Sequence, residues 1–98
     1  MKEIILSADG DCMLYSVPDE VADNLDKYCL EFCNEWLKTS PDAAKYRKDN
    51  CLCYNESDFI DYLNDYVFPD KKAVFVKNLG WINFARNEEY RYIPHFNF

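Results

Sequence analysis

The chain has 98 residues, 11 of them basic and 18 acidic, and a net charge of −7. This length is typical of one domain, here residues 1–98, and a hydrophobic content of 49% excludes a disordered chain. The negative charge disfavours nucleic acid as a partner, and no apolar run reaches the roughly 20 residues that a membrane helix needs, so no membrane partner is expected.

The first predicted element is a β-hairpin made of residues 3–8 and 11–17. The Asp9-Gly10 pair between these apolar segments is a strong signal for a two-residue turn, because both central positions of a type I′ turn need positive φ. This turn pairs Leu6 with Met13 and Ile5 with Leu14. Both faces of the hairpin are then largely apolar, which predicts a place inside a sheet.

A long amphipathic helix is predicted after Pro18, ending at Ser40, which precedes Pro41. Apolar residues recur on one side of a 3.6-residue period, and acidic or polar residues occupy the other side. The apolar side should form the spine of the core. It consists of Val21, Ala22, Leu25, Tyr28, Cys29, Phe32, Cys33, Trp36 and Leu37.

Two shorter helices should follow. Ser40 can cap a helix from Pro41 to about Lys48, which offers little apolar area through Ala44 and Tyr46 and should be peripheral. Cys51–Tyr54 predicts a brief extended segment. Asn55, with Asp58 three residues on, then predicts the start of a third helix that runs to about Val67.

The last predicted unit is a second hairpin, with strands at 73–77 and 81–84 around Asn78-Leu79-Gly80. Left-handed geometry at Gly80 would place Phe75, Lys77 and Trp81 on one face. The aromatic tail, residues 88–98, should lie across the domain or against a second subunit. The fold class is therefore α+β, in the order β-β-α-α-α-β-β, with hairpins from the two ends forming one antiparallel sheet packed against helices.

The five cysteines are an odd number without a secretory signal, which predicts free thiols and a cytoplasmic location. Cys29 and Cys33 share a helix face as metal ligands would, but their apolar neighbours favour core thiols. The only histidine, His95, lies in the tail, where a packing role is commoner than catalysis. We therefore predict no metal site and no catalytic residue.

No cofactor is expected either. The chain has only two glycines, Gly10 and Gly80, and each is needed in a predicted turn, so no glycine-rich loop can bind a phosphate group. These patterns argue against an enzyme, although tyrosines and acids lining a pocket would be an alternative basis for small-ligand binding or catalysis.

The function predicted from the sequence is a non-enzymatic protein-interaction module, comparable to an inhibitor or antitoxin, that binds a basic protein partner. The acidic residues of the amino-terminal half supply charge, and aromatic residues can supply contact anchors. The alternative is a self-associating domain with an interface around Phe75 and Trp81. The predicted partner-binding residues are Asp19, Asp23, Asp26, Phe75, Trp81, Tyr90 and Tyr92.

Overall fold

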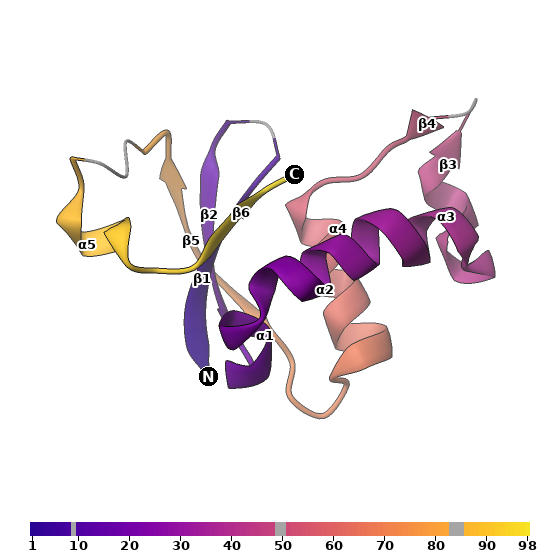
Figure 1. The fold of residues 1–98 in the computed structure, drawn as a ribbon, viewed down its shortest axis with the longest axis horizontal. Coiled ribbons are helices and arrows are strands. Elements are labelled where there is room, and N and C mark those ends of the chain that lie inside the picture. Colours follow the sequence, from indigo (N-terminus) through magenta and orange to yellow (C-terminus); the bar gives the residue numbers. More distant parts are fainter. Residues whose placement is uncertain (9, 49–50, 83–85) are drawn as a thin grey trace.

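Helices cover one face of a four-stranded sheet, as Figure 1 shows for the computed structural model, which describes residues 1–8, 10–48, 51–82 and 86–98. The strand order is β5-β2-β1-β6. The helical segments between residues 19 and 67 lie on one side of this sheet, and α5 (Glu88–Arg91) lies on the other. The α+β class predicted from the sequence is confirmed.

The first hairpin has the predicted register. β1 (Lys2–Ser7) pairs antiparallel with β2 (Cys12–Val17), and Leu6 lies opposite Met13. Gly10 has a φ of 102°, which fits the turn, while Asp9 lies outside the described residues. The two strands occupy the centre of the sheet, which explains why both of their faces are apolar.

The predicted long helix is divided into four segments: α1 (Asp19–Asp23), α2 (Leu25–Glu31), the π-helical η1 (Phe32–Trp36) and α3 (Leu37–Thr39). The break between α1 and α2 falls at Asn24, whose φ of −134° is not helical. The run ends before Ser40, as expected. The predicted apolar side is confirmed as part of the core, although Cys33 and Trp36 remain partly exposed.

The next element is a 3₁₀ helix, η2 (Pro41–Tyr46), and its peripheral position was predicted wrongly. Ala43 and Tyr46 are buried in the core while Ala44 is exposed, because residues three apart share a face of a 3₁₀ helix. Its predicted cap is confirmed, since Ser40 Oγ accepts a hydrogen bond from the Asp42 amide at 3.2 Å. A small hairpin follows, made of β3 (Arg47–Lys48) and β4 (Cys51–Leu52).

The third helix begins with a capping box, as the sequence predicts. The Asn55 side chain accepts hydrogen bonds from the amides of Ser57 and Asp58, and the Asp58 carboxylate accepts one from the Asn55 amide at 2.9 Å. This helix comprises α4 (Glu56–Tyr62) and a second π-helical segment, η3 (Leu63–Val67).

The second hairpin was predicted wrongly. β5 (Val74–Gly80) runs through the residues expected to form its loop, and Trp81 and Ile82 belong to no strand; residues 83–85 lie outside the described residues. The reason is that β5 pairs antiparallel with β2 along the whole of its length. Gly80 does have the predicted positive φ, 69°, at the end of this strand.

Two irregularities in the β2–β5 register also change the predicted faces. Phe75 lies opposite Tyr15 whereas Lys77 lies opposite Leu14, so an extra residue, Val76, separates the two pairs. Because successive residues of β2 point to opposite faces, Phe75 and Lys77 do so as well. They do not share a face as the sequence suggested.

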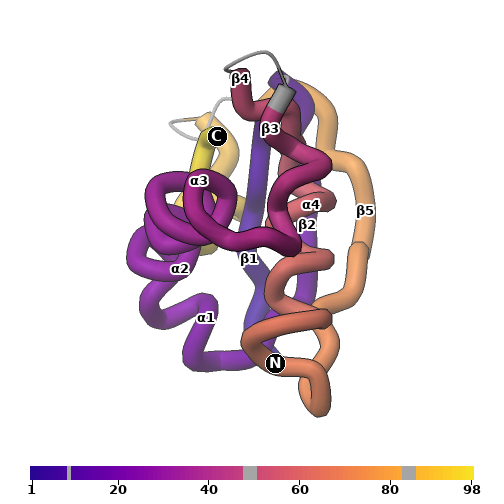
Figure 2. The backbone as a smooth tube through the Cα atoms, turned by 90° about the vertical axis from the view of Figure 1, so that its right-hand side faces the viewer, coloured from indigo at the N-terminus to yellow at the C-terminus, as the bar shows by residue number. Residues whose placement is uncertain are grey.

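The tail lies across the domain, as predicted. Its last strand, β6 (His95–Asn97), pairs with β1 in parallel, so the sheet is mixed rather than purely antiparallel. Figure 2 shows this strand beside the helical run. None of the helices formed by the described residues has the length and apolar character that a bilayer crossing requires.

Candidate functional site

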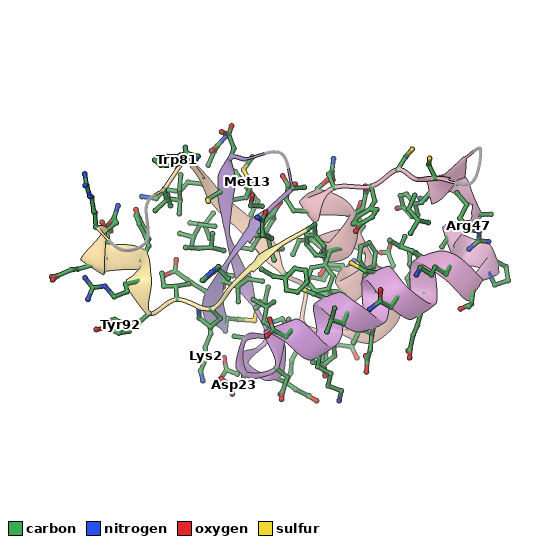
Figure 3. All side chains as sticks on the ribbon, turned by 45° about the horizontal axis from the view of Figure 1, so that its top comes forward. Lys2, Met13, Asp23, Arg47, Trp81 and Tyr92 are labelled. Atoms are coloured by element: carbon green, nitrogen blue, oxygen red, sulfur yellow. The ribbon has the colours of Figure 1, made fainter. Side chains whose placement is uncertain are left out.

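Two of the three acids predicted to bind a partner are engaged within the chain. The Met1 amino group lies 2.9 Å from Asp19 Oδ1, and Lys2 Nζ lies 2.7 Å from Asp23 Oδ1, a pair visible in Figure 3. The hydrogen bond from that amino group lowers the pKa of Asp19. These contacts join α1 to the start of β1, while Asp26 is exposed on α2.

The predicted aromatic anchors do not form one patch. Phe75 is 54% exposed and its ring lies 5.7 Å from that of Tyr15, on the helix-covered face of the sheet. Tyr90 packs against buried residues of the opposite face. Trp81 and Tyr92 are 78% and 83% exposed, and both lie at the end of the molecule away from Arg47 (Figure 3).

The structure instead brings three other aromatic side chains together, and we call Trp36, Tyr62 and Tyr66 the aromatic surface. Ring centroids are 5.0 Å apart for Trp36 and Tyr62, 5.2 Å for Trp36 and Tyr66, and 6.4 Å for the two tyrosines. Tyr66 is half exposed and the other two are partly exposed. Contact between rings at these distances is favourable beyond simple area burial.

Each half of this surface comes from, or borders, a π-helical segment. Trp36 ends η1, Tyr66 lies in η3, and Tyr62 immediately precedes η3. Isolated π-helical turns are rare and occur frequently at functional sites, because the extra residue rotates the side chains that follow. Two such turns facing each other make this surface the strongest site candidate among the described residues.

Fully buried rings support the aromatic surface from below. Phe32 stacks on Trp36 with centroids 5.8 Å apart and contacts Tyr62 at 5.3 Å. Phe59 lies behind both Phe32 and Tyr62, at 5.5 and 6.3 Å. The three rings of the aromatic surface therefore rest on a packed aromatic core that limits their movement.

Carboxylates flank the aromatic surface. Glu31 is the last residue of α2, and Glu35 directly precedes Trp36 in η1. Burial raises the pKa of Tyr62, and the negative charges of Glu31 and Glu35 raise it further. Glu35 is exposed and Glu31 partly so. An aromatic surface beside carboxylates suits a cation, because ring faces and carboxylate oxygens both attract positive charge.

A lysine of the chain already lies at the border of this surface. Lys45 Nζ is 5.1 Å from the centroid of Tyr46, and the Tyr46 ring is 6.1 Å from that of Trp36. The interaction with Tyr46 raises the pKa of Lys45, and the charges of Tyr66 and Asp58 add to this effect. A cation of the chain therefore lies over a ring that borders the aromatic surface.

The described residues also line a pocket of about 500 Å³ at the end of the sheet, next to Cys12, Ser7, His95 and Asn97. Cys12 and His95 lie on β2 and β6, on either side of β1. The two residues therefore line the same pocket from strands that are not neighbours in the sheet.

Two smaller pockets lie beside α1, one near Asp23 and Asp26, the other near Glu20 and Lys71. None of the three pockets is lined by both a tyrosine and a carboxylate, the lining predicted for a ligand site. Glu20 does accept a hydrogen bond from the Tyr28 hydroxyl at 2.9 Å. Burial and this bond raise the pKa of Tyr28 to about 12, so its proton is retained at neutral pH.

Within the described ranges no group of three or more histidine, cysteine or acidic side chains could hold a metal ion. All five cysteines are free. Burial raises the pKa of the fully buried Cys29, and the Cys33 thiol lies 3.4 Å from the Tyr54 hydroxyl. Both thiols therefore pack as core residues, as the apolar spacing suggested.

Sequence reasoning placed Trp36 in the core and did not single out Tyr62 or Tyr66. The available signal was their spacing: residues four apart on a helix share a face, and both tyrosines flank the inner face of the third helix. Which helix this face meets is a tertiary property. A comparison of the chain with protein-family models, curated proteins and solved structures finds no match.

Proposed function

We propose that this protein is a non-enzymatic interaction module that binds a basic segment of a protein partner. The observation that carries this proposal is the aromatic surface of Trp36, Tyr62 and Tyr66, flanked by Glu31 and Glu35. Tryptophan and tyrosine are enriched among the residues that dominate binding energy, and nearby carboxylates favour a basic partner.

The negative charge of the protein also favours a basic partner. The chain carries a net charge of −7, and the flanking acids of the aromatic surface lie on α2 and η1, away from the ion pairs that join α1 to β1. A basic segment approaching this surface is attracted before contact, and the rings then supply apolar area at little cost in side-chain entropy.

The test uses Trp36 fluorescence. The chain has two tryptophans, so Trp81→Phe leaves Trp36 as the sole reporter. We expect a short peptide rich in arginine and lysine to change this fluorescence in a saturable manner that weakens with salt, and a glutamate-rich peptide to have no effect. If neither peptide changes the fluorescence in a saturable manner, the proposal is wrong.

The matched variants are Tyr66→Ala and Tyr92→Ala, which remove exposed tyrosines at different places. In the Trp81→Phe background, Tyr66→Ala should weaken peptide binding about tenfold, and Tyr92→Ala should leave it unchanged. Equal effects of the two variants would show that the peptide binds elsewhere.

Self-association is the second candidate, and a specific observation favours it. β5 is an edge strand, and its Val74, Phe75 and Val76 are 58%, 54% and 45% exposed. Long apolar edges promote pairing with another chain, although Lys77 and the two register irregularities oppose it. Sedimentation at high micromolar concentration shows whether the protein is a monomer or a dimer. If it is a dimer, Val76→Lys should abolish dimer formation.

A further inference from the structure

The spacing of the rings decides which kind of cation the aromatic surface can take. A cage that encloses a methylated ammonium group holds it between facing rings, and two van der Waals contacts of 3.5–4.0 Å require roughly 7–8 Å between those rings. The centroids here are 5.0, 5.2 and 6.4 Å apart. The rings contact each other, so a cation must lie on their outer side.

An open aromatic surface beside carboxylates favours a guanidinium group over an ammonium group. A guanidinium is planar, weakly hydrated and able to stack on a single ring face while its N–H groups donate in the plane. An ammonium is a compact, strongly hydrated charge that gains little from a half-exposed ring. Tyr66 is 50% exposed, so part of its ring stays open to solvent.

The flanking acids supply the acceptors. Glu31 is the last residue of α2, and Glu35 directly precedes Trp36 in η1, so the two acids lie about one helical turn apart along the run that carries Trp36. Lys45 lies over the Tyr46 ring, and its charge interacts with Tyr66 and Asp58, so this lysine borders the Tyr66 end of the surface, whereas the two acids lie on α2 and η1. A guanidinium stacked on the tyrosines can donate to these carboxylates from its edge.

We propose that the partner presents an arginine side chain, stacked on Tyr62 and Tyr66 and hydrogen-bonded to Glu31 or Glu35. This inference rests on the proposed function, because it specifies the chemistry of the basic segment bound at the same surface. Lysine and trimethyl-lysine are the alternatives that the ring spacing and exposure disfavour.

The experiment compares four peptides that differ only at one central residue: arginine, lysine, trimethyl-lysine or glutamine. Each is titrated against the Trp81→Phe protein, with Trp36 fluorescence as the readout. We expect the arginine peptide to bind about tenfold more tightly than the other three. Equal or tighter binding of the lysine or trimethyl-lysine peptide overturns the arginine assignment and leaves the proposed function intact; binding of none overturns both.

Two further measurements test which residues form the site and whether it binds a peptide or free arginine. The double variant Glu31→Gln/Glu35→Gln should weaken the arginine peptide about tenfold and remove its advantage over lysine, whereas the matched pair Glu88→Gln/Glu89→Gln on α5 should not. Retained selectivity in the first double variant overturns the assignment. Free arginine should bind far more weakly than the peptide, and equal binding would point to a metabolite site instead of a protein partner.

Discussion

The ring centroids of Trp36 and Tyr66 lie 5.2 Å apart, although the two residues belong to separate π-helical segments, Phe32–Trp36 and Leu63–Val67. Their contact joins the two helical runs that cover the sheet. It also leaves part of both rings at the surface, beside acids of the first run. One packing contact thus creates both a structural junction and the surface that we propose as a binding site.

Phe32 should be essential for the core beneath this junction. Phe32→Ala is expected to lower the free energy of unfolding by about 3–5 kcal/mol, because the side chain is fully buried and its loss leaves a large cavity. Among the residues that the structure describes, five rings lie in contact with it: Trp36, Tyr54, Phe59, Tyr62 and Phe98. Urea denaturation measures the change, with the exposed Tyr92→Ala as a near-neutral control; similar values for both variants would disprove the core assignment.

Lys45 should compete with the partner's cation. Lys45→Ala removes the chain's own positive charge beside Tyr46 and Tyr66, so we expect the arginine peptide to bind several-fold more tightly. Lys71→Ala is the matched control, since it removes an exposed lysine that lies beside Asp19 and Glu20 and away from the aromatic surface. Peptide titration of both variants gives the comparison. If both variants bind the arginine peptide more tightly by the same factor, only the net charge of the protein affects binding.

Asp61→Asn should stabilise the fold at neutral pH. Burial, then repulsion from Asp58 and Asp65, raises the pKa of Asp61 above its ordinary value of 3.8. Ionised Asp61 therefore destabilises the folded state once the pH exceeds this raised pKa, and the penalty disappears below the ordinary value, where the carboxyl is protonated in both states. Because the burial of Asp61 is slight and most of the residue is open to solvent screening, the gain at pH 7 should be no more than about 0.5 kcal/mol.

The measurement is the melting temperature of Asp61→Asn and wild type from pH 7 to pH 3. At pH 7 the melting temperature of Asp61→Asn should be higher than that of wild type, and this difference should shrink as the pH falls. Asp26→Asn makes the same charge change at another exposed acid and should show a smaller difference. A difference that grows on acidification would show that the sign is wrong.

The thiols should react in the order of their exposure. Cys51 and Cys53 are exposed, whereas Cys12 and Cys29 are buried, and burial also raises the pKa of Cys29 and so suppresses its reactive thiolate. Alkylation followed by intact mass should show two fast additions in the native protein and five in denaturant. Peptide mapping identifies the sites. Early modification of Cys29 would refute the burial of this residue.

The elements that depend on neighbouring residues were predictable. The register of β1 and β2 follows from the turn at Gly10 and from the two-residue period of a strand. The capping box at Asn55 and Asp58 needs only residues three apart. The buried side of the first helical run follows from its 3.6-residue period. In each case the determining contacts are local in the chain.

Other features needed the whole molecule. β5 pairs with β2 and β6 with β1, so strands far apart in the chain replaced the predicted second hairpin. The break at Asn24 and the two π-helical turns interrupt the 3.6-residue period from which the helices were predicted. The candidate site itself, Trp36 with Tyr62 and Tyr66, joins two runs whose contact no local period specifies.

The sequence by itself determined the fold class, the inner face of the first helical run and the first hairpin, because local periodicity and turn geometry encode them. The tertiary structure alone decided which strands become neighbours and which rings meet beside Glu31 and Glu35. The physical reason is that side-chain packing between distant segments selects one arrangement among several that satisfy the same hydrophobic pattern.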